Sequence, residues 1–149
     1  MTTLTKCRVA ELQLLKAIEL YCSGELVPSI TLAGAAEEIL GGLLARGGGT
    51  TALQEEVEDR LDLLRTVLGK HGDRRLFVDE LNGMKNDLKH YSQGHDMSFD
   101  LEQGATDIID RAIRNFQKLK PGLQEAFIRF DDVATARIRR NVSDAHPER

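Results

Sequence analysis

The chain has 149 residues, of which 41% are hydrophobic and 30% are charged, and its net charge is −4. This length suits one domain with one core, and the sequence shows no run near the roughly 20 apolar residues that a membrane span needs. The first residues lack the pattern of a signal or transit peptide, so we expect a cytoplasmic protein that does not bind membranes. The negative charge gives no overall attraction to nucleic acids, whose binding would require a local basic patch.

The first predicted helix covers residues 4–21, where apolar side chains recur every three or four positions until Gly24 ends the pattern. Cys7 and Cys22, the two cysteines of the chain, fall along this helix. Their separation corresponds to about 22 Å, whereas a disulfide needs Cα atoms within roughly 7 Å. We therefore expect no disulfide between them. Neither belongs to a Cys-x-x-Cys pair, so we expect no structural zinc site.

A second helix is predicted to begin after Ser29, which follows Pro28 and could serve as the N-cap, and to continue through residues 30–40. Residues 33–36 are Ala, Gly, Ala and Ala, which leave little side chain around one helical turn. A neighbouring helix can approach closely there, so we expect this helix to lie at the centre of the molecule.

Gly47, Gly48 and Gly49 predict a loop, because three residues without a Cβ have too much backbone freedom to remain helical. A phosphate-binding loop would need a strand before these glycines and a Gly-Lys-Ser or Gly-Lys-Thr after them, and the sequence has neither. We interpret the segment as a flexible hinge.

Two further helices are predicted after this loop. Thr51 and Gln54 form a capping-box pattern at the start of residues 52–68, and Asp73 could cap a helix over residues 74–91. The second of these has apolar residues at alternating spacings of four and three, which is typical of a helix that packs along a seam. These seam residues are Phe77, Leu81, Met84, Leu88 and Tyr91.

Helical periodicity returns over residues 105–119 and ends at a Pro-Gly pair, and residues 123–130 could form a short sixth helix. We expect residues 1–140 to form a single domain and residues 141–149 to form a frayed tail. Because no segment alternates like a strand, the sequence predicts an all-α antiparallel helical bundle of about five helices.

A polar stripe lies opposite the predicted seam of residues 74–91. Asn82, Asn86 and His90 are spaced i, i+4 and i+8 on one helix face, with Lys85 and Lys89 beside them. A histidine can exchange a proton near neutral pH, a lysine can stabilise negative charge, and an asparagine can orient a phosphate or a sugar hydroxyl. The stripe could therefore bind or cleave a phosphodiester. The alternative is a solvated helix face without a ligand.

Residues 85–90, Lys-Asn-Asp-Leu-Lys-His, resemble the arginine-x4-6-histidine motif of the HEPN superfamily, whose members are small helical domains. The resemblance implies a homodimer and, in catalytic members, a metal-independent ribonuclease whose two sites meet at the dimer cleft. Other members have lost catalysis and bind nucleotides or proteins. By this resemblance, Lys85, Asn86 and His90 are the candidate catalytic residues. Lys85 stands where the family has arginine, and lysine lacks the bidentate fork of arginine.

Residues 31–40 together with 85–90 also resemble a group of bacterial helical proteins without an established activity. Glu37 and Glu38 lie in the first of these segments, where a carboxylate could pair with Lys85, Lys89 or His90.

We expect neither a metal nor a cofactor, because no histidine follows a glutamate at the Glu-x-x-His spacing of di-iron bundles. Our leading interpretation is a HEPN-like domain that self-associates and binds RNA, a nucleotide or a protein partner. The alternatives are a metal-independent endoribonuclease that uses Lys85, Asn86 and His90, and a scaffold that makes only protein contacts. The sequence does not decide whether the protein is an enzyme.

Overall fold

The computed structural model describes residues 3–89 and 100–145, and the regular structure within those residues is entirely helical. This confirms the all-α prediction, with six helices in place of about five. The helices are α1 (Lys6–Cys22), α2 (Leu26–Arg46), α3 (Ala52–Leu68), α4 (Arg74–Lys89), α5 (Leu101–Leu119) and α6 (Glu125–Ala145).

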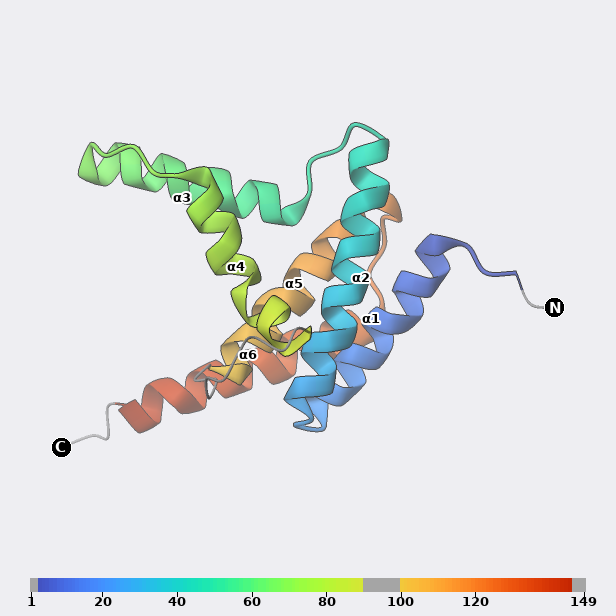
Figure 1. Ribbon diagram of the computed structural model, residues 1–149. Helices are drawn as coiled ribbons and strands as arrows, with labels where there is room; N and C mark the ends of the chain where they lie inside the picture. The colour runs from blue at the N-terminus through green and yellow to red at the C-terminus, as the bar shows by residue number, and fades with distance from the viewer. Residues whose placement is uncertain (1–2, 90–99, 146–149) are drawn as a thin grey trace.

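Four helices, α1, α2, α5 and α6, enclose the main apolar core (Figure 1). Two aromatic pairs bring α6 against the rest: Tyr21 lies 5.2 Å from Phe130, and Phe116 lies 5.7 Å from Phe127 in an edge-to-face arrangement, both measured between ring centroids. All four rings are almost fully buried, so each contributes a large apolar area in addition to the ring contact. The core therefore joins the two ends of the chain.

The central helix is α2, as residues 33–36 predicted, and it packs against α1, α5 and α4. Ala33, Ala36 and Leu40 are fully buried within it. By length and composition alone, α2 is long and apolar enough to cross a membrane, which the sequence reading did not anticipate. In this fold α1 and α5 cover one face of it.

The prediction that Ser29 caps the second helix is wrong, because α2 begins earlier, at Leu26. Pro28 lies in the first turn, where a missing N–H costs no intrahelical hydrogen bond. Ser29 is buried inside the helix, and its hydroxyl donates to the Ala17 carbonyl of α1 at 2.8 Å. The polar residue that looked like a cap instead joins α1 to α2.

The predicted sixth helix is longer than residues 123–130, because α6 runs from Glu125 to Ala145. Residues 141–145 of the predicted tail therefore belong to this helix, and residues 146–149 lie outside the described residues. The predicted boundary rests on large apolar residues, whereas this helix also packs through Ala134 and Arg137. The Arg137 guanidinium lies 4.3 Å from the centre of the Tyr21 ring, and its Nη2 donates to the Tyr21 carbonyl at 2.9 Å. An arginine therefore extends the helix's attachment to the core.

Several local predictions are confirmed. Residues 47–51 form a loop, and Thr51 and Gln54 make both hydrogen bonds of the capping box. Cys7 and Cys22 lie in the same helix and are both free. The Asp73 side chain accepts from the Arg75 amide at 2.8 Å, so it caps α4 as expected.

Helices α3 and α4 leave the core (Figure 1). The α3 helix extends outward, the following loop returns along it, and α4 then leads back to α2. Gly72 in this loop is enclosed by Leu61, Leu64 and Phe77, whose side chains would lie within 2.9 Å of an added Cβ. We call residues 61–76 the distal arm. It has only a small apolar cluster of its own.

Candidate functional site

The polar stripe of α4 is not uniformly open to solvent, because Lys85 is buried with only 7% exposure. Its Nζ lies 3.0 Å from the Glu37 carboxylate and 3.3 Å from that of Glu38, so the predicted pairing of these acids with Lys85 is confirmed. Gly34 makes room for the lysine: an added Cβ would lie 2.8 Å from the Lys85 Cδ. The small-residue turn of α2 thus accommodates a charged side chain.

The remaining stripe residues are only partly described. Asn86 is exposed, as a ligand-binding residue should be, whereas Asn82 is half-buried and its Oδ1 has no hydrogen-bond partner among the described residues. The side chain of Lys89, and His90 with Tyr91, lie outside the described residues. The assignment of Lys85, Asn86 and His90 as catalytic residues therefore stays a prediction, and so does the HEPN resemblance.

Arg111 on α5 is the principal polar residue that the sequence reading missed. It is 2% exposed, and its Nε donates to the Glu37 carboxylate at 2.9 Å. Its Nη2 donates to the Leu81 carbonyl of α4 at 3.2 Å, and its Nη1 lies 3.5 Å from the Glu56 carboxylate of α3. One arginine therefore contacts three other helices. The available signal was its position within the apolar repeat between Ile108 and Ala112.

Glu37 is the shared partner of this cluster. One of its oxygens binds Lys85 and the other binds Arg111, and all three side chains are at least nine-tenths buried. Each removal of a charge from water costs several kcal/mol, so such a cluster persists only when its partners are in place. We call Glu37, Lys85 and Arg111 the buried ion cluster. It fixes α4 to α2 and α5.

The ion pairs continue outward along α5 to the start of α3. Arg114 binds Glu55 and Glu56 at 2.8 and 3.0 Å, and Lys118 binds Glu55 at 2.6 Å. The hydrogen bond from Lys118, with another from Arg114, lowers the pKa of Glu55, whereas burial raises the pKa of Glu56 despite its two arginine neighbours. The pKa values of these two adjacent carboxylates are therefore shifted in opposite directions at the same interface.

A cavity of about 210 Å³ lies beside the buried ion cluster. Lys85 and Arg111 line it together with apolar side chains from α2, α4 and α5 and with the carboxylates of Glu80, Asp100 and Asp107. The two buried cations face carboxylates, so the space is not a strongly positive site. Its chemistry does not specify a phosphate or another anion.

A larger groove of about 530 Å³ is lined by residues of α3, α4, α5 and α6. Its lining includes the apolar residues Leu81, Phe130, Ala134 and Ile138. Around them lie five carboxylates and one cation, which are Glu56, Asp59, Asp107, Asp110, Asp131 and Arg60. We call this the acidic groove. Its charge favours a cationic occupant over RNA or a nucleotide.

Apolar side chains also collect on the distal arm. Leu63, Val67, Leu68 and Leu76 are each more than half exposed. They occur within 14 consecutive residues, whereas the other large exposed apolar residues are spread over residues 4–27 and the region from Leu123 to Ile138. The arm thus concentrates apolar surface away from the core.

Comparisons with protein-family models, with curated proteins and with solved structures find no match to this chain. Within residues 3–89 and 100–145, no group of three or more histidine, cysteine or acidic side chains is arranged to hold a metal ion. The candidate features are therefore the buried ion cluster, the acidic groove and the apolar surface of the distal arm.

Proposed function

We propose that the protein is a helical interaction module that self-associates through the distal arm. The observation that carries this proposal is the exposure of Leu63, Val67, Leu68 and Leu76 on a projecting pair of helices. Apolar surface of this kind on a folded protein often marks an interaction site. Covering such side chains would contribute roughly 25 cal/mol for each Å² removed from water.

The buried ion cluster favours this proposal over the nuclease alternative. A ribonuclease of the predicted kind needs a cation that can reach a phosphate, but the Lys85 ammonium is buried between Glu37 and Glu38. A neutralised and enclosed ammonium is a poor phosphate ligand, because binding would first require it to leave its carboxylates. Lys85 is better explained as a residue that attaches α4.

Light scattering coupled to size-exclusion chromatography tests self-association directly. Wild type should have the mass of a dimer at micromolar concentration, and the double variant Leu63→Ser, Val67→Ser should have the mass of a monomer. The matched control is Leu123→Ser with Val27→Ser, which removes two exposed apolar residues outside the arm. A monomeric wild type across the accessible concentration range contradicts the proposal.

A further inference from the structure

We infer that two copies pair antiparallel along α3, so that Lys70 of each copy lies over the acidic groove of the other. This inference rests on the proposed self-association and specifies its geometry. It joins two features that are separate in one chain, the apolar arm and the acidic groove, into one interface.

The first step is that the arm and the groove share one face of α3. Glu56, Arg60, Leu63 and Val67 follow one another at spacings of four, three and four residues, which places them along one side of the helix. Glu56 and Arg60 line the acidic groove, whereas Leu63 and Val67 are the exposed apolar residues beyond it. A partner lying on the apolar residues therefore continues directly into the groove.

The distal arm and the acidic groove carry opposite charges. The distal arm has more cations than acids, with Arg65, Lys70, Arg74 and Arg75 against Asp62 and Asp73. Within the described part of the chain, neither Lys70 nor Arg75 forms an ion pair, and neither do Asp59 and Asp131 in the groove. The unpaired cations and the unpaired acids thus lie on complementary parts of the molecule.

The symmetry of the pair determines the register of the two α3 helices. An isologous pair is related by a two-fold axis, so a contact from one copy to the other occurs twice. If the axis passes between Leu63 and Val67, each Leu63 meets the Val67 of the other copy. In this register the residue directly opposite Lys70 is Arg60, and Asp59 is its neighbour on the same turn of α3. Antiparallel pairing therefore brings Lys70 of one copy to the turn that carries Arg60 and Asp59 in the other. Arg60 is already paired with Glu80 at 3.2 Å, so Asp59 is the carboxylate that Lys70 can bind.

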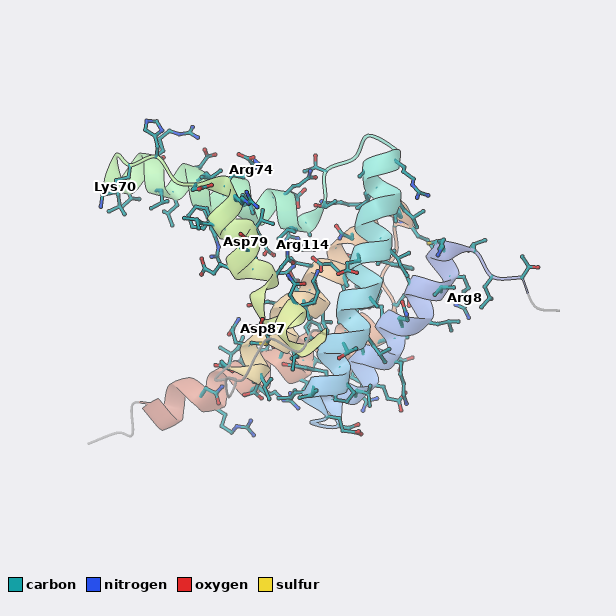
Figure 2. The ribbon with its side chains drawn as sticks, viewed as in Figure 1. Arg8, Lys70, Arg74, Asp79, Asp87 and Arg114 are labelled. Carbon is teal, nitrogen blue, oxygen red and sulfur yellow. The ribbon has the colours of Figure 1, made fainter. Side chains whose placement is uncertain are left out.

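The position of Lys70 is fixed by the end of α3. Gly69 adopts a left-handed conformation with φ +58°, and the Lys70 amide donates to the Leu64 carbonyl at 3.3 Å. Figure 2 shows Lys70 at the far end of the arm, away from Arg114 and the core. A parallel pair would place Lys70 beside Lys70 and Asp59 beside Asp59, and like charges at these positions disfavour that arrangement.

Cysteine cross-linking distinguishes the two arrangements. Leu63→Cys and Val67→Cys are prepared as separate proteins, mixed, and oxidised, with wild type oxidised as the control for Cys7 and Cys22. The expected product is a mixed dimer joining position 63 to position 67. Predominant joining of 63 to 63 and of 67 to 67 overturns the antiparallel geometry while leaving self-association intact.

Charge exchange tests the groove contact. Lys70→Glu and Asp59→Lys should each weaken dimerisation by roughly tenfold at low salt, because each places like charges together twice in the dimer. The double variant carrying both changes should regain most of the affinity, and Lys6→Glu, on α1 far from the arm, should leave it unchanged. A double variant that is as weak as the two singles, or singles that dimerise normally, overturns the contact. A monomeric wild type overturns the proposed function as well.

Discussion

The four core helices and the distal arm are stabilised by different interactions. In the core, fully buried Ala, Leu, Ile, Tyr and Phe side chains make a continuous apolar cluster. The distal arm is joined to the core through the rest of α3 and α4, where Lys85 of α4 pairs with Glu37 of α2 and Glu37 pairs with Arg111 of α5. Apolar burial is non-directional and tolerates some rearrangement, whereas an ion cluster needs all its partners at once. We therefore expect arm attachment to be the more easily lost.

The largest effect should come from the core. Phe116→Ala should lower the free energy of unfolding by about 3–5 kcal/mol, because it leaves a cavity against Phe127 and removes the ring contact. Chemical denaturation at one protein concentration measures the loss, since the apparent stability of an oligomer depends on concentration. Leu123→Ala, at an exposed position, serves as the control and should change stability by less than about 0.5 kcal/mol.

A smaller but more selective effect is expected at the ion cluster. Arg111→Leu should cost about 3 kcal/mol, because Glu37 loses one of its two cations and the Leu81 carbonyl loses its donor. Hydrogen exchange should then increase in α3 and α4 before it increases in α1 and α2. Uniform loss of protection across all helices would show that the arm and core are one cooperative unit.

The close approach of α4 to α2 can be tested within one helix. Gly34→Ala should lower stability by about 1–3 kcal/mol, because the new methyl group would lie under 3 Å from two carbons of the buried Lys85 side chain. Gly42→Ala is the matched control in the same helix, with no atom within 4 Å of the added Cβ. It should raise stability by up to about 1 kcal/mol, since alanine is the better helix former. Equal effects in the two variants would contradict close packing at Gly34.

The smallest effect concerns pH at the outer ion pairs. The pKa of Glu55 is lowered in the folded protein by its hydrogen bond from Lys118, so its stabilisation is present above the pKa of the unfolded chain and is lost as pH falls through the lower folded value. Glu55→Gln should reduce stability at pH 7 by less than about 1 kcal/mol, given its exposure. It should also make the loss of stability below about pH 4.5 less steep. An unchanged acid limb in denaturation curves would argue against this contribution.

How far the sequence could predict the molecule depends on the range of each interaction. The capping box at Thr51 and the loop at Gly47–Gly49 follow from neighbouring residues, and both are confirmed. The start of α2 and the length of α6 were wrong because contacts with distant parts of the chain decided them. Ser29 is used by α1 instead of by its own helix end, and Arg137 packs on Tyr21.

Prediction of the candidate site from the sequence is limited in the same way. A helical repeat could place Lys85 near the polar stripe of α4, but whether its ammonium faces water depends on the helices that lie against it. The pairing of Lys85 with Glu37 is predictable because an acid in an alanine-rich helix and a lysine in a polar stripe both lack a partner within their own segments. The ion pair of Arg111 could not be predicted, because a charged residue among apolar ones gives no indication of its partner until α2 and α5 are placed together.

The sequence by itself determined that the chain is all helical and where most of its helices and loops lie. It also determined which turn of α2 has side chains small enough for another helix to approach closely. Periodicity and capping decide these because they act within a few residues. Only the tertiary structure decided that Lys85 and Arg111 share Glu37, and that α3 carries its apolar residues away from the core. Burial of a charge and exposure of an apolar face both depend on which helices meet, and that is a property of the whole chain.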